Sequence, residues 1–476
     1  MGLFDIFKKN KDVQDLRGKK VFVLGLSKSG IAAAKLAKRH GANVYLSEGN
    51  EVSKDKLHLV EELRELGINV EYGGHSDEFI SKSDFAVTSP GIPPHSEIIQ
   101  NLKTRNIETI SELEFAYREN DKNKTPKQFI TITGTNGKTT TTSLTEFILK
   151  KAGLKAKACG NIGIPASDLG DEEDLDWLVC EASSFQLDMT KYFGSFVSVW
   201  TNFTPDHIDW HNGLENYFNA KTKAFKYSSF SVLNAKDEKL VEFANTLKND
   251  NMGGDSVFFF DGNIGDNCCY IEDDEIKFKE LGDVETVIKL SDCPIIGHHN
   301  YQNIMCAIIC ANLAGNYNDT TTDNETIKNA IMEFKAPAHR LEKIVEKNGI
   351  TYYNDSKATN PEAAIVAINS FNNSDVALIA GGRDKNTDLT EFCESVKGHI
   401  KTVILIGEAT ERFETELRKN GFDNIIREKT IQSAIDHATG LKPDVVLLSP
   451  ACASFDMFTG YEQRGDVFRE YVLSRV

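Results

Sequence analysis

The sequence predicts an α/β protein of three domains, and three observations support this expectation. First, 476 residues are too many for one hydrophobic core and fit about three domains. Second, apolar stretches alternate with helical patterns, which favours parallel sheets. Third, three segments pair an apolar stretch with a glycine- or proline-bearing turn, at residues 20–30, at residues 128–139 and after residue 337. Parallel sheets bind ligands at the carboxyl ends of their strands, so these turns are the first candidate sites.

Breaks in the pattern place the domain boundaries. Residues 119–126 are polar and read as a linker, and Ala336-Pro337 interrupts the pattern again. We therefore expect domains at residues 1–124, 125–337 and 338–476. Strands are expected at residues 43–46, 85–87, 128–133, 196–200, 376–380, 403–406 and 445–448, with a helix at residues 31–40. Gly153 is expected to end the helix after residue 139, and the acidic run at residues 171–174 to be a solvated loop.

Composition narrows the class of protein. With 40% hydrophobic and 26% charged residues the chain is globular rather than disordered. A net charge of −17 and the lack of a Lys/Arg cluster argue against a nucleic-acid partner. No apolar run approaches the ~20 residues that cross a bilayer, and residues 1–18 lack the apolar centre of a signal peptide, so we expect a cytoplasmic protein. Nine cysteines without a CxxC pair read as reduced, buried thiols.

The strongest single signal is the run Gly134-Thr135-Asn136-Gly137-Lys138-Thr139, which follows a predicted strand and opens a predicted helix. Its glycines let successive backbone amides face a phosphate group, and the helix adds its positive end. Lys138 supplies a charge for the β- and γ-phosphates and Thr139 a hydroxyl for Mg²⁺. Ile132 stands where the common loop has another glycine, so this is a shorter variant. The alternative, a tight turn with a chance lysine, explains less than an ATP site does.

A second glycine turn, from Gly25 to Gly30, keeps the outer glycines of GxGxxG but has Ser27 at the middle one. That glycine normally lets the backbone approach a pyrophosphate, so NAD binding is disfavoured. Glu48 follows the next strand and is placed to accept from a ribose hydroxyl. Helix–strand packing explains this turn as well as nucleotide binding does. A further turn at residues 88–93 follows another strand and offers amides to the same crevice.

Three side chains are candidates for metal or acyl-transfer chemistry. Glu181 ends an apolar strand, the usual place for a metal ligand that faces phosphates. His207 lies among acidic residues after another strand, although a capped structural histidine fits this position too. Lys221 lies on a predicted helix and would by itself pass for a surface lysine. His207 and His211 form an HxxxH pair, but Ile208 replaces the glutamate of zinc proteases, which excludes that reading.

Together these motifs resemble the Mur ligases. The segments TGTNGKTTT, EASSFQL, NFTPDHID, YFNAK, GHHNYQN, HRLE, NDSKATNP, GGRDK and SPACASFDMFTGYEQRG occur in this order, from the first glycine turn to Phe468. The phosphate loop and EASSFQL are shared across that superfamily. The segments NDSKATN and SPACASFD with YEQRG resemble its D-glutamate-adding members. A DNPR-type motif, expected of the diaminopimelate-adding members, does not occur, and the alanine-adding members usually have His where Asn136 stands.

The resemblance implies a fold and a reaction. The N-terminal domain would be Rossmann-like and bind a UDP substrate, the central domain would be of the P-loop ATPase type, and the C-terminal domain would be Rossmann-like, bind D-glutamate and close over ATP. ATP would phosphorylate the carboxylate of UDP-N-acetylmuramoyl-L-alanine, and the D-glutamate amine would attack the acyl phosphate. The product would serve peptidoglycan precursor synthesis. Two Mg²⁺ ions and a CO₂-derived carbamate on Lys221 are implied, in a monomer with Pro337 as its hinge.

The resemblance also assigns residues. The implied metal ligands are Thr139 and Glu181 for one ion, and His207 and the carbamylated Lys221 for the other. The implied catalytic groups are Lys138, Glu181, His207 and Lys221. The implied ATP contacts are Gly134, Thr135, Asn136, Gly137, Lys138, Thr139, Thr140, Asn300, Asn303, Arg340 and Asp355. The implied UDP-substrate contacts are Lys28, Ser29, Ser89, Pro90, Gly91, Asn161 and Ser183. The implied D-glutamate contacts are Lys357, Thr359, Lys385, Ser454, Phe455 and Tyr461.

Some positions depart from the family pattern, and other classes of protein compete with it. Ser47-Glu48-Gly49 stands where an acidic-hydroxyl-basic run is expected near the uracil, and Phe455 and Tyr461 replace an expected Leu and Phe. Folylpolyglutamate synthase is the alternative within the superfamily, but it usually lacks a full N-terminal domain and has GKGS at the phosphate loop. A dinucleotide-dependent oxidoreductase conflicts with Ser27, and an ATP-binding regulator leaves Lys357 and Lys385 unexplained.

Overall fold

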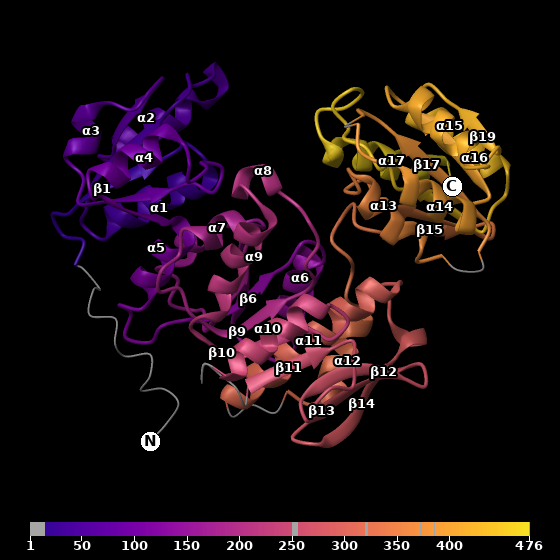
Figure 1. The fold of residues 1–476 in the computed structure, drawn as a ribbon, viewed down its shortest axis with the longest axis horizontal. Helices are drawn as coiled ribbons and strands as arrows, with labels where there is room; N and C mark the ends of the chain where they lie inside the picture. Colours follow the sequence, from indigo (N-terminus) through magenta and orange to yellow (C-terminus); the bar gives the residue numbers. More distant parts are fainter. Residues whose placement is uncertain (1–14, 250–255, 319–321, 372–373, 385, 476) are drawn as a thin grey trace. The chain divides into compact units, whose positions relative to one another are not determined.

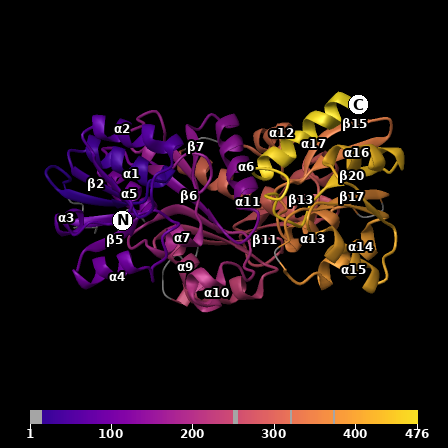
Figure 2. The same ribbon diagram turned by 90° about the horizontal axis from the view of Figure 1, so that it is seen from above.

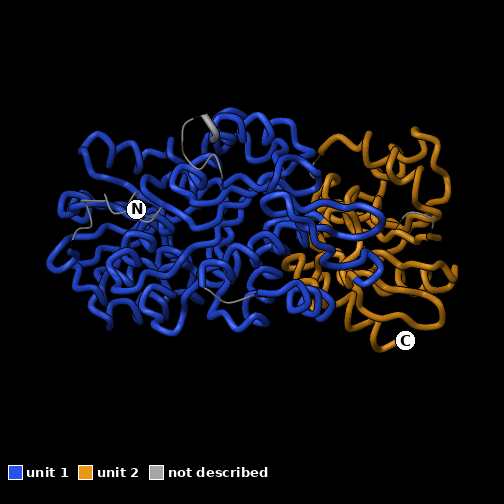
Figure 3. Tube along the Cα trace, turned by 90° about the horizontal axis from the view of Figure 1, so that it is seen from below, with its two compact units in different colours: residues 1–292, 302–333 blue, residues 293–301, 334–476 orange. Residues whose placement is uncertain are grey.

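The protein is described from a computed structural model that covers residues 15–249, 256–318, 322–371, 374–384 and 386–475. Three helix-covered sheets organise these residues (Figures 1 and 2). The chain divides into two compact units (Figure 3). The first unit holds residues 1–292 and 302–333, and the second holds residues 293–301 and 334–476. This α/β architecture of three sheets confirms the predicted fold class, whereas the three domain boundaries stay a prediction.

The first sheet is parallel and has the strand order β3-β2-β1-β4-β5. Its strands are β1 (Lys20–Leu24), β2 (Asn43–Glu48), β3 (Asn69–Tyr72), β4 (Phe85–Thr88) and β5 (Glu108–Ser111). Its helices are α1 (Lys28–Arg39), α2 (Leu57–Glu65), α3 (Asp77–Ser81), α4 (Glu97–Thr104) and α5 (Glu112–Asn120). Strands β2 and β3 are added on one side of β1, and strands β4 and β5 are added on its other side. The turns after β1 and β4 therefore border the crevice where such sheets bind ligands.

Alternation along β1 explains why helices cover both faces of this sheet. Val21 and Val23 pack in one core cluster, together with residues of α1 and α2. Phe22 and Leu24 pack in another, together with residues of α3 and α4. Successive side chains of a strand point to opposite faces, so a continuous apolar strand needs a helical layer on each side.

The second sheet has nine strands in the order β14-β13-β12-β11-β10-β9-β6-β8-β7. Its strands are β6 (Gln128–Thr133), β7 (Ala156–Gly160), β8 (Trp177–Glu181), β9 (Ser195–Trp200), β10 (Ser228–Asn234), β11 (Val257–Phe260), β12 (Cys268–Glu272), β13 (Glu275–Glu280) and β14 (Asp283–Lys289). Its α-helices are α6 (Lys138–Lys151), α7 (Ser184–Asp188), α8 (Ile208–His211), α9 (Leu214–Thr222), α10 (Glu238–Asn249), α11 (His298–Tyr317) and α12 (Asn324–Glu333). Strand β6 lies between β8 and β9, so the phosphate loop follows an interior strand of the sheet.

One edge of this sheet differs from the parallel arrangement that the sequence predicted. Strands β12, β13 and β14 pair antiparallel at the end of the sheet, where Figure 1 labels them side by side. Asp273 and Asp274 connect β12 to β13 with φ values of 54° and 58°. Positive φ at both central residues is the requirement of a type I′ hairpin turn, which aspartate tolerates better than most residues. The central sheet is therefore mixed rather than purely parallel.

The third sheet has the order β15-β16-β20-β17-β18-β19 and is parallel except for the pairing of β15 with β16. Its strands are β15 (Glu342–Lys347), β16 (Ile350–Asn354), β17 (Val376–Gly381), β18 (Thr402–Ile406), β19 (Ile425–Arg427) and β20 (Val445–Leu448). Its helices are α13 (Pro361–Ile368), α14 (Thr390–His399), α15 (Thr410–Lys419), α16 (Ile431–Gly440) and α17 (Tyr461–Arg475). Alternate strand residues again divide between two core clusters, so α16 and α17 share one face.

Most predicted elements are present with small shifts at their ends. The strands predicted at residues 128–133 and 445–448 have the same bounds as β6 and β20, and the other observed strands are one or two residues longer than predicted. The helix predicted at residues 31–40 begins three residues earlier, because the Ser27 hydroxyl accepts from the Gly30 amide and caps it. Gly153 follows α6 with a φ of 81°, as expected for a residue that ends a helix. All nine cysteines are free and buried.

Within the described ranges, no helix is long and apolar enough to cross a membrane.

The acidic run at residues 171–174 is exposed, but it is more than a solvated loop. Asp171 pairs with Arg39 at 2.6 Å and with Nε2 of His40 at 2.7 Å. Nδ1 of His40 also lies 2.6 Å from the Glu119 carboxylate, which is 3% exposed. The hydrogen bond with Glu119 is the main reason why the pKa of His40 is raised, against the opposing effect of burial. A protonated His40 therefore joins α1 to α5 and to the loop that precedes β8.

Replacing His40 by alanine should destabilise the first unit more at pH 6 than at pH 9. A raised folded pKa means that the imidazolium stabilises the fold fully below the unfolded pKa of about 6.5, and that this contribution is lost as the pH rises through the folded value. We expect a loss of about 1–2 kcal/mol at pH 6. Urea unfolding followed by tryptophan fluorescence measures it, because Trp177 and Trp200 are buried in this unit. The exposed His58 of α2 provides the control. An equal loss at both pH values would contradict the prediction.

Candidate active site

The phosphate loop connects β6 to α6, and its two glycines are required by geometry. Gly134 has a φ of 148° and Gly137 a φ of 82°. A Cβ on Gly134 would lie 1.9 Å from the Thr201 hydroxyl, and one on Gly137 would lie 2.6 Å from Oδ1 of Asn303. No other residue type fits this combination of left-handed backbone and close neighbours. Gly137 precedes α6 directly, so the loop ends at the positive end of a 14-residue helix.

Two residues after β9 hold the loop in shape. The Asn202 carbonyl accepts from the Thr135 amide at 3.1 Å, and Oδ1 of Asn202 accepts from the Asn136 amide at 2.9 Å. The Thr201 hydroxyl donates to the Asn136 carbonyl at 2.6 Å. These bonds fix the amides and carbonyls of the loop from the neighbouring strand, so Thr201 and Asn202 shape the site without being part of the glycine motif.

Lys138 and Thr139 begin α6 and face the loop and β8. Nζ of Lys138 donates to the carbonyls of Gly134 at 2.9 Å and Thr135 at 2.8 Å. The Thr139 hydroxyl donates to Oε2 of Glu181 at 2.7 Å. Glu181 is 3% exposed at the carboxyl end of β8, and its Oε1 accepts from the Asn161 amide group at 2.8 Å. The site therefore brings together an ammonium group, a hydroxyl and a buried carboxylate, all next to the phosphate loop.

Lys221 is buried rather than on the surface. It lies on α9 with 1% exposure, and its Nζ donates to the Gly134 carbonyl at 2.8 Å. The Tyr217 ring lies 4.8 Å from the same nitrogen. Burial, and to a lesser degree the charge of Lys138, holds the pKa of Lys221 well below its usual value. The geometry therefore favours a neutral amine beside the phosphate loop, which is the form of lysine that acts as a nucleophile.

His207 and His211 differ in their surroundings, although both lie near α8. His207 precedes the helix with a φ of 52°, is half exposed and lies 3.4 Å from the Asp206 carboxylate. Burial and the charges of Lys138 and Lys221 lower its pKa, and Asp206 opposes them. His211 is buried, its Nε2 lies 2.9 Å from the Ser184 hydroxyl, and burial lowers its pKa to about 4. Only His207 therefore belongs with the loop, and His211 is a structural histidine.

The donor atoms around the loop fit a hard cation. Among the described residues, no group of three or more His, Cys, Asp and Glu side chains gathers as a metal centre. The pair formed by the Thr139 hydroxyl and the Glu181 carboxylate nevertheless supplies two oxygens next to the phosphate loop. Mg²⁺ prefers such a sparse set of protein oxygens, because substrate phosphates and water complete its coordination.

The first sheet carries a second crevice, between the turns after β1 and β4. Gly25 has a φ of 94°, and a Cβ on Gly30 would lie 2.0 Å from the Gly25 carbonyl, so close packing of α1 requires both glycines. The Ser27 hydroxyl donates to Oγ of Ser89 at 2.8 Å, and the Ser89 hydroxyl donates to the Leu24 carbonyl at 2.7 Å. Serine at position 27 therefore links the two turns. Of the neighbouring predicted contacts, Lys28 and Gly91 are exposed, while Ser29 and Pro90 are half-buried.

The end of β2 has its own polar network. Oε2 of Glu48 accepts from the Leu26 amide at 2.9 Å, and its Oε1 accepts from the Asn50 amide at 3.0 Å. The Ser47 hydroxyl donates to Glu71 at 2.7 Å and lies 2.7 Å from Nδ1 of His75. Glu48 thus supports the glycine turn through the backbone. A ribose contact by Glu48 stays a prediction.

Two asparagines of α11 were predicted as ATP contacts, and they lie in different units. Oδ1 of Asn303 accepts from the Thr141 hydroxyl at 3.0 Å and lies beside Gly137, so Asn303 belongs to the phosphate-loop site. The side-chain amide of Asn300 donates to the Ile296 carbonyl at 2.7 Å within the second unit. Thr140 is buried in the first turn of α6, and Ser183 caps α7 by accepting from the Gln186 amide at 3.3 Å.

In the second unit, Asp355 lies at the carboxyl end of β16. Its Oδ2 accepts from the Ser449 hydroxyl at 2.8 Å, and its Oδ1 accepts from the Leu341 amide at 3.1 Å. Burial raises the pKa of Asp355 to about 7, against the effects of these bonds and of the charge of Arg340. A carboxyl group that titrates near neutrality at the end of a parallel strand is a candidate ligand contact.

Arg464 organises the loops that carry the predicted D-glutamate residues. It is 1% exposed on α17, and its guanidinium donates to the carbonyls of Ser356 at 2.8 Å and Cys452 at 3.1 Å. Its Nε also donates to the Ser356 hydroxyl at 2.9 Å. Burial lowers the pKa of Arg464 to about 10, so it stays protonated at neutral pH. One buried cation thus fixes the backbone on both sides of the predicted pocket.

The predicted D-glutamate residues lie around these loops. Nζ of Lys357 lies 3.8 Å from the centre of the Tyr461 ring. Ser454 is buried, Thr359 is half-buried, and Phe455 is 63% exposed. The described ranges of the chain do not include Lys385.

Comparison with known proteins bears on these sites. Three family models match the chain along its length. The "Mur ligase MurD-like, N-terminal domain" covers residues 19–111, the "Mur ligase middle domain" covers residues 132–311, and the "Mur ligase, glutamate ligase domain" covers residues 339–452. A protein of Acidobacterium capsulatum called UDP-N-acetylmuramoylalanine--D-glutamate ligase is 39% identical over 97% of this chain and 97% of its own. One of the same name from Caldicellulosiruptor saccharolyticus is 37% identical over 96% and 99%.

The chain belongs to the Mur ligase family.

Solved structures of other Mur ligases share the fold. The MurF ligase of Thermotoga maritima, solved in complex with ADP, matches 98% of this chain and 97% of its own with a TM-score of 0.56 at 16% identity. The UDP-N-acetylmuramate-alanine ligase of the same organism matches 96% and 100% with a TM-score of 0.55 at 18% identity. At this level of identity the likeness concerns the arrangement of sheets and helices, and it agrees with the predicted α/β class.

Within this Mur ligase, the first unit brings together most of the residues predicted around ATP and the metal ions. Lys138, Thr139, Glu181 and Lys221 meet at the loop through direct bonds, and His207 lies close enough for the lysine charges to lower its pKa. Sequence reasoning gave no role to Thr201 and Asn202, although their position directly after β9 was a usable signal. It also missed Arg464, for which the sequence offers no signal, because only the fold shows which carbonyls its guanidinium reaches.

Proposed function

We propose that this Mur ligase joins D-glutamate to UDP-N-acetylmuramoyl-L-alanine at the expense of ATP, as a monomer in the cytoplasm and as a step of peptidoglycan precursor synthesis. The observation that carries the proposal is the cluster of Lys138, Glu181 and a buried Lys221 at the phosphate loop of β6. The relatives at 37–39% identity over nearly the full length, all called UDP-N-acetylmuramoylalanine--D-glutamate ligase, support the choice of substrates.

The chemistry explains why a carboxylate needs ATP before it becomes an amide. A carboxylate resists nucleophilic attack because it is anionic and has no adequate leaving group. Its oxygen attacks the γ-phosphorus of ATP, ADP leaves, and the resulting acyl phosphate has both a carbonyl open to attack and a phosphate to expel. The neutral D-glutamate amine attacks that carbonyl. The tetrahedral intermediate then loses phosphate and a proton and becomes the amide.

The chain's own groups lower the barrier to bringing two anions together. Lys138 is placed to donate to phosphate oxygens instead of the loop carbonyls that it bonds now, and the amides at the start of α6 add donors. Thr139 and Glu181 would hold one Mg²⁺, and His207 with a modified Lys221 would hold the other. The bound ions would neutralise phosphate charge.

We also propose a carbamate on Lys221, and the same geometry supports it. The burial that lowers the pKa of Lys221 favours the neutral amine. The amine nitrogen would attack the carbon of CO₂, so that one N–C bond forms while one C=O π pair moves to oxygen. A proton would then leave to solvent, which turns a potential cation into a carboxylate. The carboxylate would also attract the nearby Lys138, whose charge disfavours protonation of Lys221.

We also propose the contacts of each substrate and the bounds of the three domains. The crevice around Gly25 and Ser89 would take the UDP moiety, with Lys28, Ser29, Pro90, Gly91, Asn161 and Ser183 around it. ATP would also contact Asn300, Asn303, Arg340 and Asp355. D-glutamate would lie among Lys357, Thr359, Lys385, Ser454, Phe455 and Tyr461, because lysines and hydroxyls suit two carboxylates. Domains would cover residues 1–124, 125–337 and 338–476, with Pro337 as the hinge.

Release of ADP tests the proposed reaction. The purified chain is given ATP, magnesium and UDP-N-acetylmuramoyl-L-alanine, and then D-glutamate, L-glutamate or meso-diaminopimelate. The proposal expects ADP and an amide product with D-glutamate only. Turnover with L-glutamate alone, or with a folate and L-glutamate in the manner of folylpolyglutamate synthase, would refute the substrate assignment.

Replacing Lys221 by alanine should lower the rate of ADP formation about 100-fold, because the second metal position loses a ligand. Added formate or acetate should restore part of the rate by supplying the missing carboxylate. Lys226 is exposed and follows the same helical region, so its alanine variant is the control and should keep full activity. Mass spectrometry under CO₂ gives a readout besides activity, namely the added mass of a carbamate that the Lys221 variant lacks. An active Lys221 variant, or one without rescue, would count against the carbamate.

A further inference from the structure

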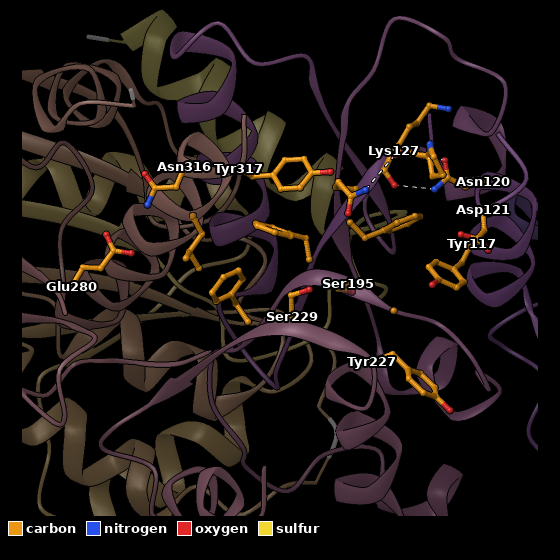
Figure 4. A pocket seen from close by; sticks show the side chains of 17 residues that line it. Tyr117, Asn120, Asp121, Lys127, Ser195, Tyr227, Ser229, Glu280, Asn316 and Tyr317 are labelled. Atoms are coloured by element: carbon orange, nitrogen blue, oxygen red, sulfur yellow. Dashed lines mark hydrogen bonds between the residues drawn. The ribbon is translucent and has the colours of Figure 1, made fainter. Parts of the chain in front are cut away.

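A large cavity (Figure 4) lies away from the phosphate loop, because it is at the amino ends of β6, β9 and β10 and the loop follows the carboxyl end of β6. It has a volume of about 510 Å³, which is within the range of small-molecule sites. It is lined at the amino ends of three strands, by Gln128 and Phe129 of β6, Ser195 and Phe196 of β9, and Ser229 and Phe230 of β10, and also by residues of α5, β13 and α11. The first residue of β6 lines this cavity and its last precedes the phosphate loop, about 17 Å further along the strand. The cavity is therefore separate from the proposed active site.

Aromatic rings form the walls, and they hold one another in place. The Phe196 ring lies 4.9 Å from that of Tyr317 and 5.2 Å from that of Phe230, centre to centre. On the other side, the rings of Tyr117 and Phe129 lie 6.0 Å apart in an edge-on arrangement. Such contacts fix ring orientation, so the cavity presents ring faces and edges of defined direction.

The backbone around the cavity is also fixed. A Cβ on Gly194 would lie 2.8 Å from the Tyr227 carbonyl and 3.1 Å from the Tyr117 hydroxyl, so only glycine leaves this wall as it is. The Asn120 side chain donates to the Lys127 carbonyl at 2.9 Å and accepts from the Lys127 amide at 3.0 Å. Figure 4 shows this pair of bonds, which joins the end of α5 to the residue before β6. Close packing and hydrogen bonds within the first unit therefore fix the shape of the cavity.

The charged groups of the cavity favour a cationic ligand. Asp121 and Glu280 line it, and Figure 4 shows them on opposite sides of the ring-lined space. The remaining charged lining residue, Lys127, donates its ammonium group to the Gly170 carbonyl at 2.9 Å. Burial raises the pKa of both Asp121 and Glu280, and Asn316 donates a hydrogen bond that partly offsets this for Glu280. Among the described residues that line the cavity, no ammonium group pairs with either carboxylate. The two carboxylates therefore disfavour an anionic ligand, and a neutral ligand would leave their charges uncompensated.

We propose that this cavity binds a linear aliphatic polyamine, with one ammonium group at Asp121, another at Glu280 and the methylene chain along the aromatic rings. Ammonium groups interact favourably with ring faces as well as with carboxylates, and the apolar chain matches the rings between them. Helix α11 contributes Asn316 and Tyr317 to the cavity and Asn303 to the phosphate-loop site, so one helix joins the two. The proposal concerns the first unit alone and does not depend on the proposed reaction.

Calorimetric titration of the full-length protein with spermidine, without ATP and at about 0.15 M salt, tests the proposal. We expect one site, with binding weakened about tenfold or more by Glu280→Gln and by Asp121→Asn. Asp283→Asn removes the same charge from an exposed position of the neighbouring strand β14 and should leave binding unchanged. An aliphatic diol of the same length should not bind.

The proposal would be overturned by no heat of binding, by equal weakening from Asp283→Asn, or by diol binding as tight as spermidine binding. Circular dichroism checks the fold of each variant. If a carboxylate variant fails to fold, Tyr317→Ala at the exposed rim replaces it, and unchanged spermidine binding by that variant would also refute the site. Lys138→Ala should bind spermidine like the parent, so failure of the proposed reaction and failure of this site give different results.

Discussion

Replacing Lys138 by alanine is expected to lower the rate of ADP formation by about 10²–10³-fold while the protein remains folded. The lysine is half-buried at the start of α6, and its Nζ donates to the loop carbonyls of Gly134 and Thr135, so its ammonium group is placed to exchange them for phosphate oxygens. Because the charge acts on the phosphate as it is transferred, the loss should fall on kcat as well as on the KM for ATP.

A steady-state assay of ADP release over a range of ATP concentrations measures this loss. Lys150→Ala is the matched control, because Lys150 lies on the same helix, is 48% exposed and pairs with Glu146. The control should turn over like the parent. A Lys138 variant that kept the parental rate would remove the basis for the proposed phosphoryl transfer.

Replacing Arg464 by methionine is expected to destabilise the second unit by about 3–5 kcal/mol. The guanidinium satisfies the carbonyls of Ser356 and Cys452 in the interior, and methionine would leave them buried without a donor. The same change should raise the KM for D-glutamate more than the KM for ATP, since the loops on both sides of the proposed amino-acid pocket lose their shared anchor.

Hydrogen–deuterium exchange at β16 and β20 is the suitable measurement. All three tryptophans, Trp177, Trp200 and Trp210, belong to the first unit, so their fluorescence does not report on the second. Arg475→Met on the same helix α17 removes an exposed arginine that pairs with Asp436 at 3.5 Å, and it should change neither exchange nor KM. Equal exchange in the two variants would show that the buried guanidinium contributes little.

Patterns local in sequence predicted the fold class and the centre of the site. Apolar strands followed by glycine turns were sufficient to locate β6 and its loop, because the required backbone conformations exclude other residues at Gly134 and Gly137. The sequence did not predict the antiparallel edge of the central sheet, because the turn between β12 and β13 has no glycine. Asp273 and Asp274 adopt the conformation that asparagine and glycine usually provide, so no local sequence pattern indicated this hairpin.

Properties that depend on burial could not be predicted from the sequence. Lys221 reads as a surface lysine on a polar helix, and only the fold shows its amine 2.8 Å from the Gly134 carbonyl. Arg464 reads as an ordinary helical arginine, although it is 1% exposed. The cavity between α5, β13 and α11 collects residues more than 190 positions apart in the chain, from Tyr117 to Tyr317, and no local pattern connects them.

The hydrogen bonds already present around the phosphate loop have a consequence for selectivity. The Lys138 ammonium holds two carbonyls, the Thr139 hydroxyl holds Glu181, and the Asn136 amide is held by Asn202. A visiting ion must therefore displace these internal bonds before it can use all of the donors of the loop. Chloride brings too few acceptors to do so, whereas a polyphosphate chain replaces several bonds at once. The loop should therefore bind an anion with many acceptor oxygens more tightly than an anion with few.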